Sequence, residues 1–206
     1  NALSGLHAKG AGLRNYSLGV CKVVGGPAIA AVLEDEEAEI QGFLAAGHVC
    51  TIMGLSEYYP LVDQYQVPVV VTGFEPVDLL QGILMTVRQL EQGKAILENQ
   101  YSRVVKPEGN PQAIDIIQQV FEVCDREWRG IGNIPVSGYA IRESLAQYDA
   151  DRKFEVNIPK AKECATCIAG EVLKGIKKPF QCPEFAKGCT PQTPLGAPMV
   201  SSEGAC

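Results

Sequence analysis

Eight cysteines are the residues of this sequence best able to do chemistry, and five of them lie close together near its end. A cysteine thiolate binds zinc or iron, forms disulfides or acts as a nucleophile. Clustered cysteines therefore indicate a metal site, a crosslink or a redox centre. The remaining three, Cys21, Cys50 and Cys124, are scattered and are expected to be small buried side chains. The five follow the pattern C-x2-C-x14-C-x6-C-x16-C, at Cys164, Cys167, Cys182, Cys189 and Cys206.

Residues 150–206 need a group that holds them together. This segment is rich in lysine and proline and has few regular apolar patterns, so it cannot easily bury a core of its own. Disulfides need an oxidising compartment, and nothing in the sequence indicates export. Structural zinc sites usually combine two close cysteine pairs, whereas here only Cys164 and Cys167 are that close. An iron–sulfur cubane accepts ligands from widely separated loops, so the spacing leaves disulfides, zinc and a cluster as candidates.

The elements that would precede this segment alternate between strand and helix patterns. Residues 67–72, VPVVVT, are typical of a strand buried on both faces of a parallel sheet, and residues 42–46 are a second short apolar run. Residues 16–24 are rich in strand formers. We predict a layered α/β domain with a parallel sheet over residues 1–149, followed by a small irregular cysteine-rich domain over residues 150–206. Apolar spacing predicts helices over residues 28–40, 55–65, 76–92 and 110–123, the last capped by Asn110, and a short one near residues 169–174.

Polar residues follow the predicted strands, where ligands of parallel sheets bind. His48 lies in a predicted loop after the first apolar run, and Glu75 lies in the loop after VPVVVT. A histidine there can be a ligand or a proton carrier, although a lone histidine in a turn is more often structural. Glu75 is equally well explained as a helix cap. Arg103 and Lys106, between two predicted helices, either attract an anion or decorate the surface.

Composition and missing motifs exclude several classes of protein. The 18 basic and 24 acidic residues give a formal charge of −6 without an arginine-rich stripe, which argues against nucleic-acid binding. No apolar run is long enough to cross a bilayer, and we expect a cytoplasmic protein with no membrane partner. The glycines fit neither a Walker loop nor a dinucleotide fingerprint, and G-x-S-x-G is absent.

Seven strings of residues occur in this order: GHV, VVVTGFEPVDLLQGI, ENQYSRVVKPEGNP, WRGIGNIPVSG, GEVLKG, CPEFAKGCTP and MVSSEGAC. Together they resemble the HypD family of hydrogenase maturation factors, and the resemblance covers residues 13–206. The resemblance implies a scaffold and redox protein, more than a turnover enzyme. On such a scaffold the Fe(CN)2CO unit of nickel–iron hydrogenases is assembled, with a HypC-like stable partner and a HypE-like cyanide donor.

The same resemblance implies that the cysteine-rich domain holds a 4Fe–4S cluster. Cys164 lies outside the strings and is the alternate to Cys167, while Glu203 is a candidate polar group beside the cluster. Four thiolates leave no open iron site, so the cluster would relay electrons. Carried over by motif, the ligands are Cys167, Cys182, Cys189 and Cys206.

The sequence also departs from the family. The Cys-Gly-Gly-His motif that holds the iron and the Cys-Pro-x-Cys pair are both absent, and the chain begins where the second α/β domain would begin. We therefore expect a fragment that binds a cluster and lacks the iron-binding domain.

The alternative hypothesis is a zinc-stabilised binding module on an α/β domain. A third hypothesis, a redox enzyme with Cys50 or Cys124 as nucleophile, predicts a low thiol pKa at one of them.

Overall fold

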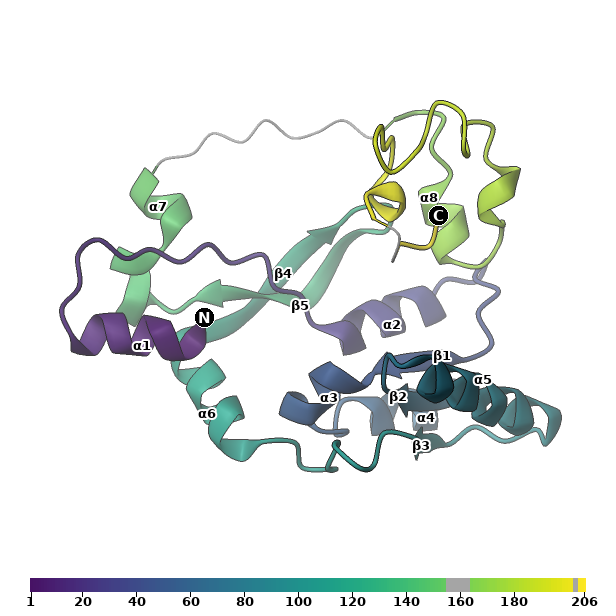
Figure 1. Cartoon of the computed structure of the whole chain (residues 1–206), viewed down its shortest axis with the longest axis horizontal. Coiled ribbons are helices and arrows are strands. Elements are labelled where there is room, and N and C mark those ends of the chain that lie inside the picture. Colours follow the sequence, from purple (N-terminus) through teal and green to yellow (C-terminus); the bar gives the residue numbers. More distant parts are fainter. Residues whose placement is uncertain (155–163, 202–203) are drawn as a thin grey trace. The chain divides into compact units, whose positions relative to one another are not determined.

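The computed structural model describes residues 1–154, 164–201 and 204–206, and Figure 1 shows their helices and strands. The chain forms two compact units, each built from segments that are separate in sequence. The first unit comprises Asn1–Lys22, Gln41–Val123 and Tyr139–Lys153. The second comprises Val23–Ile40, Cys124–Gly138 and Phe154–Cys206. The second unit thus includes two segments that precede the cysteine-rich tail, and the domain boundary at residue 149 stays a prediction.

A three-stranded parallel sheet forms the centre of the first unit. Its strands are β1 (Phe43–Ala46), β2 (Val69–Thr72) and β3 (Leu97–Asn99), in the spatial order β1-β2-β3. Val69 pairs with Phe43 on one side and with Leu97 on the other. Every residue of β2 is buried, as predicted from its continuous β-branched sequence. The α/β fold with a parallel sheet is therefore confirmed.

Helices of the first unit pack against this sheet. α3 (Gly47–Met53) and α5 (Pro76–Glu91) contact β1 and β2, and α4 (Tyr58–Tyr65) contacts β3. The predicted loop at residues 47–49 is wrong, because α3 begins directly after β1. A Cβ atom at Gly47 would overlap the carbonyl of Thr72, so glycine lets the helix start close to β2.

The helix predicted over residues 110–123 is α6 (Pro111–Val120). Its cap is as expected, since the amide of Ala113 donates to Asn110 Oδ1 at 3.1 Å. It ends three residues early because strand β4 begins at Phe121. α6 packs against α1 (Ala2–Gly10) and α3.

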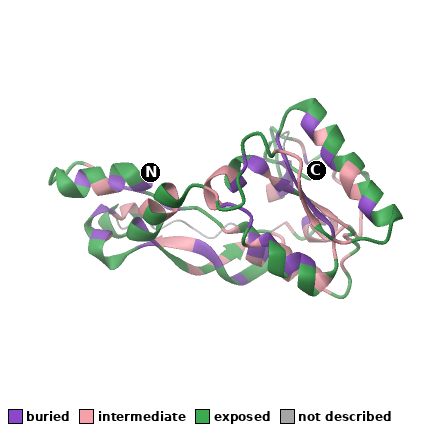
Figure 2. Cartoon of the chain, turned by 90° about the horizontal axis from the view of Figure 1, so that it is seen from below, coloured by how far each residue is buried: buried purple, intermediate pink, exposed green. Residues whose placement is uncertain are grey.

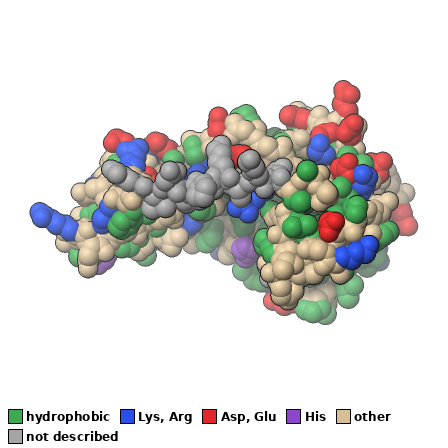
Figure 3. Space-filling view, turned by 90° about the horizontal axis from the view of Figure 1, so that it is seen from above, with side chains coloured by type: hydrophobic (Ala, Val, Ile, Leu, Met, Phe, Trp, Pro, Cys, Tyr) green, Lys and Arg blue, Asp and Glu red, His purple; other side chains and the backbone are tan. Residues whose placement is uncertain are grey.

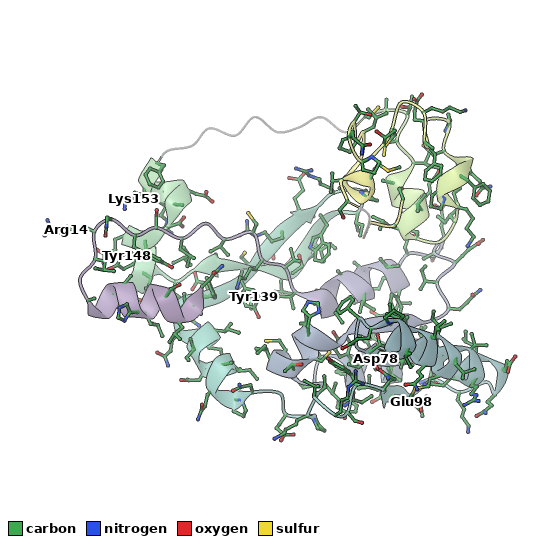
Figure 4. All side chains as sticks on the ribbon, viewed as in Figure 1. Arg14, Asp78, Glu98, Tyr139, Tyr148 and Lys153 are labelled. Atoms are coloured by element: carbon green, nitrogen blue, oxygen red, sulfur yellow. The ribbon has the colours of Figure 1, made fainter. Side chains whose placement is uncertain are left out.

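α5 approaches the sheet through polar and small residues. A Cβ atom at Gly82 would overlap the Thr72 side chain, so glycine permits this close approach. The buried Gln89 accepts a hydrogen bond from the Ile96 amide at 2.9 Å and donates one to Glu98 Oε2 at 2.5 Å. It thereby ties α5 to β3 (Figure 4 labels Glu98). Apolar side chains of α5 such as Leu80 are exposed, and Figure 2 shows the same mixture of buried and exposed positions along the helices.

A second apolar cluster of the first unit joins α1, α6 and the 3-10 helix Glu143–Tyr148. Tyr148 donates a hydrogen bond to the carbonyl of Ala8 at 3.1 Å, and Lys153 Nζ donates to the carbonyls of Arg14 and Tyr16 at 3.0 and 3.1 Å (Figure 4). Residues 16–24, predicted as a strand, form only the isolated bridges Leu18–Asp149 and Val23–Gly138 among the described residues.

The second unit contains short helices and most of a two-stranded sheet. α2 (Gly25–Leu33) is shorter than the predicted helix because Asp35 leaves it, accepting from the amide of Glu37 and pairing with Lys174. The sheet of β4 (Phe121–Trp128) and β5 (Gly132–Ile141) was not predicted. Residues 164–206 contribute α8 (Ala169–Leu173) and the 3-10 helices Pro179–Gln181 and Ala197–Met199, and α7 (Ala150–Phe154) comes before them.

Figure 3 shows lysine and arginine side chains scattered among acidic ones on the face that it presents, consistent with the formal charge of −6. Within the described ranges, every helix is too short or too polar to span a membrane.

Candidate functional site

Four cysteines of the second unit border one small cavity. They are the four residues assigned by motif, so the structure brings the whole predicted set together. Cys189 is buried, and the others are partly exposed. Beside the sulfurs, the walls carry apolar side chains and glycine. The lining consists of Cys167, Cys182, Cys189 and Cys206 with Ile168, Ala169, Phe185, Gly196, Pro198 and Met199.

Cys182 and Cys189 reach the cavity from the two ends of a closed loop. The amide of Cys189 donates to the carbonyl of Glu184 at 2.9 Å, and the amide of Phe185 donates to the carbonyl of Cys182 at 3.1 Å. Ala186 adopts φ 56°, a left-handed conformation that reverses the chain. The spacing of six residues is too long for a zinc knuckle, yet this loop brings both cysteines to one cavity.

Cys167 lies at the start of α8, in a turn closed by its amide and the carbonyl of Cys164, which are 2.9 Å apart. Cys167 borders both the cysteine cavity and a neighbouring open cleft of about 880 Å³. Cys164 borders the cleft. Its sulfur lies 3.2 Å from the hydroxyl of Thr166, and this hydrogen bond lowers the pKa of the Cys164 thiol. The arrangement favours Cys167 over Cys164 as the ligand, and that assignment stays a prediction.

Cys206 reaches the cavity after the 3-10 helix Ala197–Met199. Its amide donates to the carbonyl of Pro198 at 3.4 Å, and the amide of Gly204 donates to the carbonyl of Ser201 at 3.2 Å. A Cβ atom at Gly204 would overlap the Pro198 carbonyl, so glycine permits this return of the chain. Glu203, the predicted polar neighbour of the cluster, lies outside the described residues.

The electrostatics of the cavity call for positive charge. Burial raises the pKa of the Cys206 thiol, and the nearby Cys167, Cys189 and Cys182 raise it further by repulsion. Four thiolates crowded in an apolar cavity disfavour one another unless a cationic group lies between them. Iron would supply that charge, and soft thiolates are the ligands of iron–sulfur clusters. The donor set therefore fits such a cluster. The fit lies in the type of donor and in the shared cavity: in the part of the chain that the structure describes, no three or more His, Cys, Asp or Glu side chains are already arranged as ligands of one metal ion.

A second group of polar residues lies at the carboxyl ends of the parallel strands in the first unit. Arg103 Nη1 and Nη2 contact the two carboxylate oxygens of Asp78 at 2.8 and 2.5 Å, and Glu75 lies 3.7 Å from Arg103. Hydrogen bonds from Arg103, followed by Gln100, hold the pKa of Asp78 well below its usual range. Asp78 was not predicted, although its position in the first turn of a helix after a buried strand was the available signal.

The remaining polar candidates have less specific surroundings. The ring of His48 lies 4.9 Å from that of Phe74, centroid to centroid, and Lys106 is exposed. The expectation that the three scattered cysteines are buried is confirmed for Cys50 and wrong for Cys21, which is exposed, while Cys124 is partly buried. Burial raises the pKa of the Cys50 thiol. The hypothesis of a Cys50 nucleophile with a low pKa is therefore wrong.

Comparisons with known proteins identify the class of protein to which this fold and cavity belong. A family model described as HypD, Hydrogenase formation hypA family, matches residues 1–206. The hydrogenase maturation factor HypD2 of Bradyrhizobium diazoefficiens is 41% identical over 201 residues, which are 94% of this chain and 53% of that protein. HypD of Rhodobacter capsulatus is 44% identical over 200 residues, 95% of this chain and 53% of that protein.

The chain is thus a relative of hydrogenase maturation factors, and it belongs to the HypD family. A further relative, HypD of Cupriavidus necator, is 40% identical over 206 residues, 97% of this chain and 54% of that protein. The chain spans about half the length of these curated relatives. Membership of the HypD family confirms the resemblance that the sequence strings indicated.

Proposed function

We propose that this chain is the redox module of a hydrogenase maturation scaffold and that it carries a 4Fe–4S cluster. The ligands would be the thiolates of Cys167, Cys182, Cys189 and Cys206. The observation that carries this proposal is that all four cysteines line one largely apolar cavity, although they are spread over residues 167–206. Membership of the HypD family supports the maturation role independently of the cavity.

The residues around the cavity would hold the cluster and exclude water from it. Four thiolate ligands leave no open iron position, so a bound cluster supplies electron transfer and no Lewis acid. The apolar side chains of Ile168, Phe185 and Met199 line the same cavity and limit solvent access, which affects the reduction potential of a bound cluster.

The wider function includes partners. We infer that the chain contributes to assembly of the Fe(CN)2CO unit of nickel–iron hydrogenases with HypC-like and HypE-like proteins, in the cytoplasm, where thiols stay reduced. Attaching cyanide and carbon monoxide to iron needs reducing equivalents, and an electron-transferring cluster is suited to deliver them. Binding of a HypC-like protein to this chain, measured by calorimetry, tests the partner proposal.

Anaerobic purification followed by metal and sulfide analysis tests the cofactor. We expect a brown protein with about four irons and four acid-labile sulfides per chain. For Cys→Ser variants of the four proposed ligands, Cys124→Ser is the matched control, because Cys124 lies in the same unit on strand β4. A colourless protein with one zinc ion per chain would contradict the cluster and support the alternative, a zinc-stabilised binding module. Cys124→Ser should keep the full iron content, whereas Cys182→Ser should lose most of it.

A further inference from the structure

The segment Pro194–Gly196 contacts two of the four cysteines that line the cavity. The backbone amide of Leu195 donates a hydrogen bond to Cys189 Sγ, with nitrogen and sulfur 3.3 Å apart. The next residue, Gly196, lies against Cys167 Sγ and lines the cavity. Two consecutive residues thus touch sulfurs that come from separate turns.

The amide of Leu195 is the group that would act on a bound cluster. An N–H donor stabilises negative charge on a thiolate sulfur. A cluster becomes more negative when it is reduced, so the same hydrogen bond strengthens on reduction and raises the reduction potential. Leu195 itself is 37% exposed and is not among the residues that line the cysteine cavity, so its contact with the site is the backbone amide.

Glycine is needed at position 196 because of the nearby Cys167 sulfur and not because of its backbone conformation. Its φ of −134° and ψ of 157° are extended values that any residue adopts. A Cβ atom at this position would overlap Cys167 Sγ, so even alanine would displace the sulfur. Gly25 is a suitable comparison in the same unit, because a Cβ atom there has no heavy atom within 4 Å.

Two threonines fix the approach to this segment. The amide of Thr193 donates to the carbonyl of Thr190 at 3.0 Å, and their hydroxyls are also 3.0 Å apart. Thr193 Oγ1 donates to the carbonyl of Gly188 at 3.3 Å. These bonds close the chain between Cys189 and Pro194, so the Leu195 amide is directed at the sulfur by a closed turn.

We propose that Leu195, through its amide, and Gly196, through its missing side chain, are positioning residues for the cluster. The amide holds the Cys189 thiolate and raises the reduction potential, and Gly196 leaves the room that Cys167 needs as a ligand. This inference rests on the proposed function, because it requires that the four cysteines bind a cluster.

The first experiment is a redox titration of the anaerobically purified chain, monitored by electron paramagnetic resonance. Leu195→Pro removes the donor, whereas Leu195→Ala keeps it and serves as the control. We expect Leu195→Pro to lower the equilibrium constant for reduction about tenfold relative to Leu195→Ala, a shift of about −59 mV for a one-electron couple. An equal potential in the two variants overturns the role of the amide.

A second variant covers the case in which proline disturbs the turn. Replacing Leu195 by the α-hydroxy acid of leucine keeps the side chain and exchanges the N–H donor for an ester oxygen. A lowered potential, or loss of the cluster from this variant while Leu195→Ala keeps it, supports the proposal. An ester variant with the wild-type potential and wild-type iron content overturns it.

The second experiment follows release of iron to a chelator. Gly196→Ala should release iron faster than wild type, and Gly25→Ala should match wild type. Equal release from Gly196→Ala and Gly25→Ala overturns the role of Gly196 while the cluster itself stands. Absence of iron from the wild-type chain overturns the proposed function, and the positioning roles with it, so the two failures are distinguishable.

Discussion

Cys164 and Cys167 are joined by a turn, with the amide of Cys167 2.9 Å from the carbonyl of Cys164, yet of the two only Cys167 lines the cysteine cavity. Cys167 lines the cysteine cavity together with Cys182, Cys189 and Cys206. Cys164 borders the larger neighbouring cleft, and its thiol is hydrogen-bonded to the hydroxyl of Thr166. A spacing of two residues therefore does not make the two thiols equivalent.

This difference predicts separate effects of two serine variants. Cys167→Ser should lose most of its cluster, because it removes a sulfur from the cavity, whereas Cys164→Ser should keep iron near the wild-type level. Iron and sulfide analysis after anaerobic purification measures both. The assignment would be wrong if Cys167→Ser kept its cluster and Cys164→Ser lost it.

The Asp78–Arg103 pair predicts a pH-dependent contribution to stability. Its hydrogen bonds lower the pKa of Asp78, so the stability it adds is fully present above the ordinary carboxyl pKa of about 3.9 and is lost as the pH falls through the lowered value. The difference in free energy of unfolding between wild type and Asp78→Asn should be constant near neutral pH and shrink below about pH 4. Urea denaturation at several pH values measures it.

An exposed aspartate in the same unit provides the control for that experiment. Asp63 lies on α4, and Asp63→Asn should leave the stability almost unchanged over the same pH range. A difference for Asp78→Asn that stayed constant down to about pH 2 would refute the role assigned to the ion pair.

The cap of α6 predicts a modest loss of stability. Asn110→Ala removes the acceptor of the Ala113 amide and should reduce the free energy of unfolding by about 1 kcal/mol. Asn110→Asp retains a capping oxygen and should stay close to wild type. Thermal or urea unfolding followed by circular dichroism distinguishes the two, and an equal loss in both variants would count against the cap.

Burial predicts the reactivity of the scattered thiols. Cys50 is fully buried with a raised pKa, and Cys21 is exposed. Under native conditions iodoacetamide should label Cys21 well before Cys50, as read by mass spectrometry of timed samples. Denaturant should bring the two rates together. Fast labelling of Cys50 in the native protein would contradict its burial.

The sequence predicted those elements whose signals are local. VPVVVT is rich in β-branched residues, and such a run is typical of a strand buried on both faces of a sheet. Asn110 and Pro111 mark the start of α6 by chemistry that acts within one turn. The end of α6 was misplaced because Val120 and Phe121 continue the apolar pattern while the chain changes to strand.

Sequence reasoning failed where distant segments decide the structure. Nothing local to residues 121–141 shows that Trp128 Nε1 will donate to Ser137 Oγ, at 2.8 Å, and charged residues along β4 mask its alternation. The cysteine set followed from motif wording, but the contact of Leu195 with Cys189 depends on how the loop closes. Spacing alone carries no information about that closure.

If the proposed cluster binds here, the closed loop from Cys182 to Cys189 makes these two residues a chelating pair. Its own hydrogen bonds hold both ends before any metal arrives, so the second sulfur is present at a high effective concentration once the first has bound iron. Cys167 and Cys206 come from other turns and lose more conformational freedom when they bind. We therefore expect the loop to capture iron first and the other two thiols to complete the coordination afterwards.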